Sequence, residues 1–248
     1  MKNNDWIILN SINYKIHSIE EEQEMRLKVM EMLGYLINFD SASFYIVKGN
    51  NPRELTAPVG IHYTRADMED YINIYKNIDY SEGLMYTGKN IAYRESDILS
   101  EKERIASEYY KKVYDVQGWH YSLHLNISFE GEFLGVMSFF RKKKKEDFEY
   151  EDIFILDMVK DHLALRLKRD KDTRLNKKMT VQECAEHYGL SEKETQVLQW
   201  LLTDTTPEEI SDILDISVST YRKHCNRIYK KTDVSQRIEL YDKVLAAE

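Results

Sequence analysis

The hydrophobic positions in the first two thirds of the chain follow a helical period and then a strand period. Apolar residues recur every three or four positions between Ile19 and Asn38, which predicts an amphipathic helix. Apolar and polar residues alternate from His120 to Phe129, and a second apolar segment runs from Phe133 to Arg141 after a Glu130-Gly131 turn. These two segments predict a β-hairpin.

Other segments complete the predicted secondary structure of this part of the chain. Ala42–Lys48 alternates as a strand, residues 67–77 and 100–113 have helical patterns, and an amphipathic helix begins near Tyr150. The helices and strands are interspersed and the clearest strand pair is a hairpin. The pattern therefore predicts an α+β domain over about residues 1–168, with an antiparallel sheet flanked by helices.

Tyrosines are concentrated in the middle of this domain. Ten of the 18 tyrosines lie between Tyr63 and Tyr121. A tyrosine combines a flat apolar ring with one polar tip, which suits the capture of a small molecule. For each ring taken alone, packing in the core with the hydroxyl at the surface is the favoured interpretation. For the cluster as a whole we favour a ligand pocket.

Two histidines and a basic run accompany the hairpin. His120 and His124 lie on one face of the predicted strand about 13 Å apart, at roughly 3.3 Å per residue, which is too far for both to bind one metal ion. That polar face either lines a cavity or faces water. The run Arg141–Lys145 is expected to be a solvated loop, although it could contact phosphate.

The last quarter of the chain shows a different pattern. No acidic residue occurs from Ser217 to Lys231, where basic residues and apolar residues recur on opposite faces of a predicted helix. Upstream, Ser191 with Glu194 and Thr206 with Glu209 form two capping boxes, which predict two helix starts. The second of these helices is expected to bury Ile210, Ile213 and Leu214. The basic helix could be a solvated face, but its apolar back favours a helix that docks on its neighbours and enters a DNA groove.

The motifs of this region resemble the LuxR-type (NarL/FixJ-type) helix-turn-helix. The matching segments are Leu190–Leu198, Thr206–Ile210, Leu214–Ser217 and Val234–Leu240. The resemblance implies an all-α four-helix domain over residues 180–248 that binds double-stranded DNA with the helix after Ser217 in the major groove. It implies base contacts from Arg222, Lys223 and Asn226, and phosphate contacts from Thr220, Arg227 and Lys230.

Several positions depart from the family pattern. Asp204, Asp215 and Asp233 stand where the family usually has glycine, and Thr232 stands where it usually has leucine. Aspartate tolerates left-handed backbone better than most residues, so the turns remain possible. The helix before the basic helix is acidic, which makes the affinity of one domain for DNA modest. We therefore expect a homodimer that reads two half-sites.

The charged run of residues 169–179 separates the two predicted domains. It follows a helix with a leucine-rich stripe. Two interpretations remain open: a solvated linker, or a helix that pairs across a dimer and transmits a change of state.

The order of elements in the first domain resembles GAF-type sensor domains and the autoinducer-binding domains of LuxR regulators. The segment Tyr71–Tyr80 is similar to the aromatic and aspartate cluster that holds an acyl-homoserine lactone in the latter, although the accompanying tryptophans are absent. The resemblance thus implies a pocket for a small-molecule effector rather than the lactone itself. Together with the hairpin, it gives these candidate ligand-binding residues: Tyr71, Tyr75, Asp79, Tyr80, His120 and His124.

Composition narrows the functional classes. The net charge of −8, two cysteines and the absence of a long apolar run favour a cytoplasmic protein without a disulfide framework, metal site or membrane span. No phosphate-binding glycine loop or nucleophile motif is present, so we expect neither a cofactor nor an enzyme. A phosphorylated receiver domain is also not expected. The chain is predicted to be a transcription regulator with a small-molecule sensor; alternatively, the first domain only dimerises or binds a protein partner.

Overall fold

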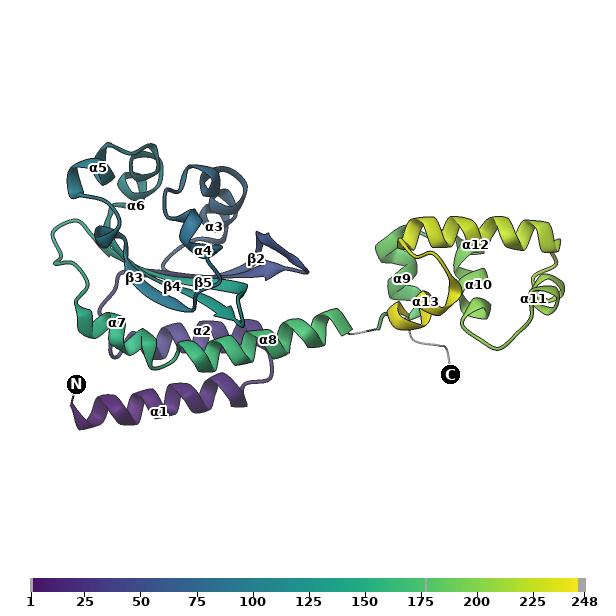
Figure 1. The fold of residues 1–248 in the computed structure, drawn as a ribbon, viewed down its shortest axis with the longest axis horizontal. Helices are drawn as coiled ribbons and strands as arrows, with labels where there is room; N and C mark the ends of the chain where they lie inside the picture. The colour runs from purple at the N-terminus through teal and green to yellow at the C-terminus, as the bar shows by residue number, and fades with distance from the viewer. Residues whose placement is uncertain (1, 177, 245–248) are drawn as a thin grey trace. The chain divides into compact units, whose positions relative to one another are not determined.

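The computed structural model describes residues 2–176 and 178–244, and its contacts divide the chain into two compact units, Met1–Lys171 and Asp172–Glu248. The first unit is built on a five-stranded antiparallel sheet with the strand order β2-β1-β5-β4-β3 (Figure 1). The expected antiparallel sheet and its hairpin are confirmed, since β4 pairs with β5 along most of its length. The strands are β1 (Ser41–Lys48), β2 (Asn51–Ile61), β3 (Ile91–Arg94), β4 (Trp119–Phe129) and β5 (Glu132–Lys142).

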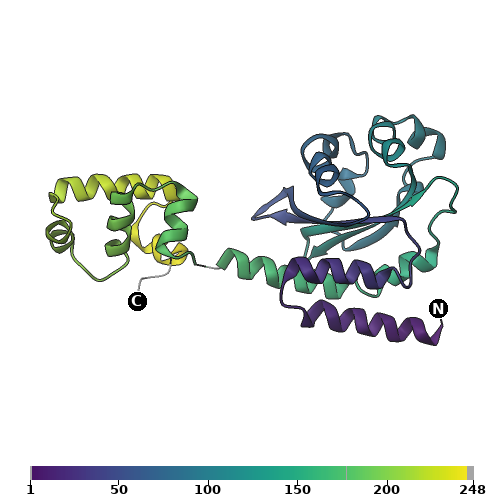
Figure 2. The same ribbon diagram turned by 180° about the vertical axis from the view of Figure 1, so that it is seen from behind.

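Helices cover one face of this sheet, and the N-terminal helix lies on the outer side of this layer, away from the strands (Figures 1 and 2). They pack on the apolar positions of the strands, among them Leu123, Leu125 and Ile127 of β4, which are fully buried. The strand alternation thus directs one set of side chains into this helical layer and the other set to the opposite face. The helices are α1 (Asn3–Ser18), α2 (Glu22–Leu33), α7 (Tyr150–Asp157) and α8 (Lys160–Asn176).

Short helices and turns cover the opposite face of the sheet (Figure 2). The predicted helices over 67–77 and 100–113 are each interrupted. The first changes to a π-helical turn at Tyr71, and the second breaks where Ser107 adopts extended backbone, with φ −64° and ψ 152°. The elements of this layer are α3 (Arg65–Asp70), π-turn Tyr71–Tyr75, 3-10 turn Lys76–Ile78, α4 (Glu82–Met85), 3-10 turn Glu95–Asp97, α5 (Glu101–Ala106), π-turn Tyr110–Tyr114 and α6 (Asp115–Gln117).

Helix α8 continues through most of the predicted linker of residues 169–179 and ends at Asn176. Its buried Arg166 donates hydrogen bonds to the carbonyl oxygens of Ile16 and Ile19, both at 2.6 Å, which holds α8 against the end of α1. Near the unit boundary, the buried ammonium of Lys171 lies 2.6 Å from Glu132 at the start of β5. The first part of the charged run is therefore helical and packed on the first unit.

The second unit is helical, as predicted, and the described part of it contains five helices rather than four. The additional helix begins after Thr180, whose side chain forms a capping box with Glu183. Leu198, Leu201 and Ile210 form the core of this unit, whereas Ile213 is 51% exposed, so its predicted burial is wrong. Ile213 is the last residue of its helix, and the next residue, Leu214, packs against the core instead. The helices are α9 (Val181–Tyr188), α10 (Glu192–Leu201), α11 (Pro207–Ile213), α12 (Val218–Thr232) and α13 (Arg237–Lys243).

Candidate DNA-binding and ligand-binding sites

Helix α12 separates its basic and apolar side chains on opposite faces. Tyr221, Cys225 and Ile228 are buried against the other helices of the unit. The exposed side carries most of the predicted DNA contacts, and within the described residues none of these side chains forms an ion pair with an acid. They are Arg222, Lys223, Asn226, Arg227 and Lys230. Free cationic groups in a row on one helix are what phosphate and base-edge contacts require.

Several other polar residues in and next to α12 have structural partners. Ser217 caps the helix and accepts a hydrogen bond from the Thr220 amide at 3.1 Å, and the two hydroxyls lie 2.8 Å apart. Lys231 bonds to Glu194 at 2.8 Å and is thus drawn towards α10. Thr232, in place of the usual leucine, is fully buried and donates to the Ile228 carbonyl at 2.8 Å.

Two of the three aspartates in the expected glycine positions adopt left-handed backbone. Asp215 has a φ of 50° and Asp233 a φ of 52°, so both turns keep the geometry that a glycine would favour. Asp204 does not have a positive φ, and its turn therefore needs no glycine.

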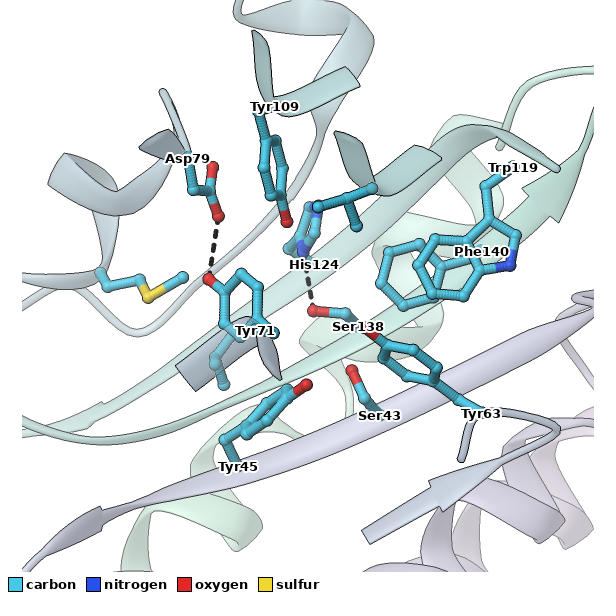
Figure 3. Close-up of a pocket in the computed structure, with 13 residues that line it drawn as sticks. Ser43, Tyr45, Tyr63, Tyr71, Asp79, Tyr109, Trp119, His124, Ser138 and Phe140 are labelled. Atoms are coloured by element: carbon cyan, nitrogen blue, oxygen red, sulfur yellow. Dashed lines mark hydrogen bonds between the residues drawn. The ribbon is translucent and has the colours of Figure 1, made fainter. Parts of the chain in front are cut away.

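A small cavity lies in the first unit between the sheet and its layer of short helices (Figure 3). The space open to the centre of a water molecule is about 20 Å³, enough for roughly one water. We call the surrounding residues the cage: Ser43, Tyr45, Tyr63, Tyr71, Asp79, Met85, Tyr109, Val113, Trp119, His124, Val136, Ser138 and Phe140.

Aromatic rings make up most of the cage wall. Trp119 and Phe140 are stacked, with ring centroids 3.8 Å apart and planes 9° apart. Tyr63 meets the Trp119 ring edge-on at 4.8 Å, and Tyr45 and Tyr71 are 5.3 Å apart. Such pairs supply flat apolar surface with fixed geometry.

The strands β4 and β5 supply a polar part of the cage. His124 Nδ1 lies 2.8 Å from the Ser138 hydroxyl, and its Nε2 lies 2.7 Å from the Ser122 hydroxyl. Burial lowers the pKa of His124 to about 4, so the imidazole is neutral at pH 7. The polar face of the hairpin strand is therefore buried at His124 rather than facing water.

Asp79 contributes a buried carboxylate. Its Oδ2 accepts a hydrogen bond from the Tyr71 hydroxyl at 2.9 Å, and its Oδ1 accepts bonds from the amide and hydroxyl of Ser81 at 2.8 and 2.7 Å. Burial raises the pKa of Asp79 above its ordinary value, while the bonds from Ser81 and Tyr71 act in the opposite direction. This network fixes the segment after the first π-turn.

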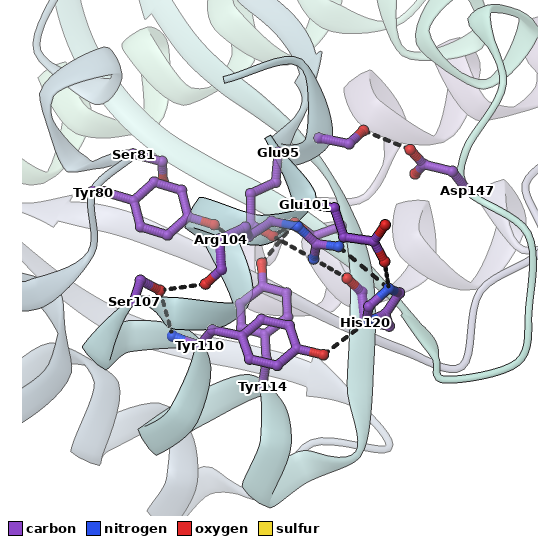
Figure 4. A network of polar contacts seen from close by, with 12 residues as sticks. Tyr80, Ser81, Glu95, Glu101, Arg104, Ser107, Tyr110, Tyr114, His120 and Asp147 are labelled. Atoms are coloured by element: carbon purple, nitrogen blue, oxygen red, sulfur yellow. Dashed lines mark hydrogen bonds and ion pairs between the residues drawn. The ribbon is translucent and has the colours of Figure 1, made fainter. Parts of the chain in front are cut away.

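A second polar network lies behind the cage and is centred on Glu95 (Figure 4). Its carboxylate accepts a hydrogen bond from Tyr80 and lies 3.6 Å from the guanidinium of the buried Arg104. Ser122 donates to the same carboxylate at 3.3 Å and thereby links it to His124. Burial raises the pKa of Glu95 to about 7, despite the opposing effect of these partners.

The structure brings together only some of the predicted ligand-binding residues. Tyr71, Asp79 and His124 line the cage, whereas Tyr75 and Tyr80 pack against the aromatic cluster from outside its lining. His120 lines a separate hollow, because a register irregularity between Trp119 and Tyr121 breaks the strict alternation of β4. As a result, Trp119 rather than His120 lines the cage.

Sequence reasoning missed most of the other cage residues. Tyr63 and Tyr109 belong to the tyrosine-rich region, so their enrichment was a usable signal. Ser43, Tyr45 and Ser138 lie on the same face of paired strands, and only the register of β1 with β5 brings them together.

The family comparison concerns the second unit. Residues 188–244 match the profile of the family described as bacterial regulatory proteins, luxR family. The match covers about the last quarter of the chain, and this region is therefore similar to the helix-turn-helix of LuxR-family regulators. Among the described residues, no helix is long and apolar enough to cross a membrane.

Structural comparisons concern mainly the first unit, and at these identities they show its fold alone. The VqsR LBD domain from Pseudomonas aeruginosa matches with a TM-score of 0.50 and 14% identity, over 71% of this chain and 100% of that one. The N-acylhomoserine lactone dependent LuxR family transcription factor CepR2 from Burkholderia cenocepacia has a TM-score of 0.50 and 13% identity, over 67% and 99%.

A GAF domain has a similar fold. The GAF domain from a phosphoenolpyruvate-protein phosphotransferase of Coxiella burnetii matches with a TM-score of 0.50 and 15% identity, over 70% of this chain and 99% of that one. The expected resemblance of the first unit to GAF and autoinducer-binding domains is thus confirmed at the level of fold. A search of curated proteins gives no match.

Proposed function

We propose that the protein is a homodimeric transcription regulator whose first unit binds a small molecule in the cage and thereby controls DNA binding by α12. One observation carries the proposal: the cage joins a polar sheet surface to aromatic residues from two irregular segments. Tyr71 begins one π-turn, and Tyr109 immediately precedes the other. Irregular helical turns of this kind are frequent at functional sites.

The size of the cavity constrains how binding would occur. At about 20 Å³ it accommodates little more than a water, so a larger ligand must displace the short helices that cover the sheet. Ligand binding is then coupled to a movement of this layer. A ligand shifts the regulator between two states only by its difference in affinity for them.

Filling the cavity tests the proposal. Ser43→Leu places a larger side chain in the cage, whereas Ser128→Leu makes the same change at a buried serine of β4 that does not line it. The full-length variants are purified from the same cells and analysed by native mass spectrometry. We expect a bound small molecule in the wild type and in Ser128→Leu, and none in Ser43→Leu. Equal occupancy in all three proteins, or none in the wild type, contradicts the proposal.

A second candidate function is dimerisation without a small molecule. It is favoured by the close packing of the cage rings and by exposed apolar side chains on α1: Trp6, Ile7 and Tyr14 are 50%, 65% and 67% exposed. Under this alternative, a small-molecule extract of the cells leaves the affinity for operator DNA unchanged. A change in affinity that Ser43→Leu abolishes and Ser128→Leu retains favours the sensor.

A further inference from the structure

A hollow of about 380 Å³, distinct from the cage, opens at the surface of the first unit. Its size falls within the range of sites for small organic ligands. It lies between the second π-turn and the loop after β5, and it includes part of the basic run that the DNA-binding function does not use. Its lining residues are Ile105, Tyr110, Lys111, Asp115, His120, Lys143 and Lys144.

The charges around this hollow do not cancel. Lys143 forms an ion pair with Asp115. The ammonium of Lys111 donates to the neutral carbonyl of Ala106 at 2.7 Å, and that of Lys144 makes no hydrogen bond or ion pair within the described residues. Two of the three lysines thus lack an acidic partner, although the chain as a whole has a net charge of −8.

Apolar and aromatic surface accompanies these charges. Ile105 is 41% exposed at the hollow, and the ring of Tyr110 lies 6.0 Å from the ammonium of Lys143. The Tyr110 hydroxyl lies 2.7 Å from Nδ1 of His120, whose Nε2 lies 3.2 Å from Glu101 (Figure 4). The floor of the hollow is therefore fixed by the network that also contains Arg104.

The loop that carries the lysines is held in place by its backbone. The Lys143 amide donates to the Gly118 carbonyl at 3.2 Å, and Lys144 adopts left-handed backbone with a φ of 79°. Lys143 and Lys144 thereby face the same hollow as Lys111 from a different element. Cations from two elements around an aromatic wall match a ligand with an anionic group and a flat body.

We infer that this hollow binds a small organic anion, a carboxylate or phosphate ester with a compact apolar or aromatic body. The anionic group lies between Lys111 and Lys144, and the body packs on Tyr110 and Ile105. This site is separate from the cage, although the second π-turn contributes residues to both. The first unit then has a second ligand site, and the ligand of this site is an anion.

Ligand-observed NMR on the full-length protein tests the inference with phenyl phosphate and benzoate as probes. Benzyl alcohol serves as the uncharged control. We expect saturation transfer to both anions and none to the alcohol. Lys111→Gln combined with Lys144→Gln weakens binding on the order of tenfold, the effect expected of two exposed ion contacts. Ile105→Ala weakens the binding of phenyl phosphate, because it removes apolar contact with the ring.

Two matched controls locate the binding. Lys112→Gln removes a neighbouring lysine that pairs with Glu108 at 2.6 Å and does not line the hollow. Lys223→Ala with Arg227→Ala removes cations of α12, where an anion could bind instead. Both controls retain full probe binding if the inference holds. Loss of binding in either control, or its persistence in the Lys111 and Lys144 variant, overturns it.

Discussion

Replacing Glu95 by glutamine changes the pH dependence of stability of the first unit. The carboxyl has an ordinary pKa of 4.5 and a pKa of about 7 in the folded protein, because burial disfavours its charged form. The folded state therefore holds more protons than the unfolded state between these two values. Its stabilising contribution is complete below pH 4.5 and is lost as the pH rises through about 7.

The size of the effect follows from the two pKa values. At about 1.4 kcal/mol per pH unit, the wild-type free energy of unfolding falls by about 3 kcal/mol between pH 4.5 and 7 because of this group. His124 acts in the opposite direction: its pKa of about 4 lies below its ordinary 6.5, so its contribution rises with pH over that interval. His124 is present in both proteins, and the difference between them isolates Glu95.

The assay uses fluorescence of a single tryptophan. The chain has three, and Trp6→Phe with Trp200→Phe leaves only Trp119 of the cage as a reporter of the first unit. Urea unfolding of this background, with and without Glu95→Gln, is measured from pH 4.5 to 8. We expect the difference in unfolding free energy to change by about 3 kcal/mol across the range. A difference independent of pH would refute the assignment of a raised pKa to Glu95.

Three further predictions concern other regions. In α12, Lys223→Ala or Asn226→Ala reduces the preference for operator over scrambled DNA, by ~1–3 kcal/mol per lost base contact. Lys230→Ala instead weakens binding to both DNAs alike and lowers the slope of log binding constant against log salt concentration by about one. Titrations with operator and scrambled DNA measure both effects. At the end of α12, Asp233→Gly raises the unfolding free energy of the second unit by up to about 1 kcal/mol, because Asp233 has a φ of 52°. The control Asp212→Gly, inside α11, lowers this free energy. A lower unfolding free energy in Asp233→Gly would contradict the left-handed turn at this position. On α1, Trp6→Ser with Ile7→Ser shifts the sedimentation of the protein from dimer to monomer, and an unchanged dimer would place the interface elsewhere.

The segments that could be predicted are those whose pattern repeats. The alternation of Leu123, Leu125 and Ile127 predicted β4 because one face of the strand packs on the helical layer throughout. Capping boxes at Ser191 and Thr206 predicted the starts of α10 and α11 because each is a local arrangement of adjacent residues. In contrast, β2 contains Pro52 and Pro58 and few apolar positions, and it was not predicted.

The candidate sites differ in the same way. On α12 every predicted side chain belongs to one helix, so its helical period determines which residues share a face. The cage instead combines residues distant in sequence, such as Ser43 and Ser138, which pair across β1 and β5. Its composition also depends on the irregularity at Trp119 and on the π-turn at Tyr71, neither of which follows from a regular period.

The charge state of the cage restricts the class of effector that it accepts. Burial keeps His124 neutral and raises the pKa of both Asp79 and Glu95, so the interior disfavours charge of either sign. The nearby buried cation, Arg104, already faces Glu95 and the His120 carbonyl. An ionised ligand would lose its hydration there without gaining a free counter-charge. The proposed effector of the cage is accordingly uncharged and binds through hydrogen bonds and ring contacts, whereas the anion that we infer for the first unit binds in the lysine-lined hollow.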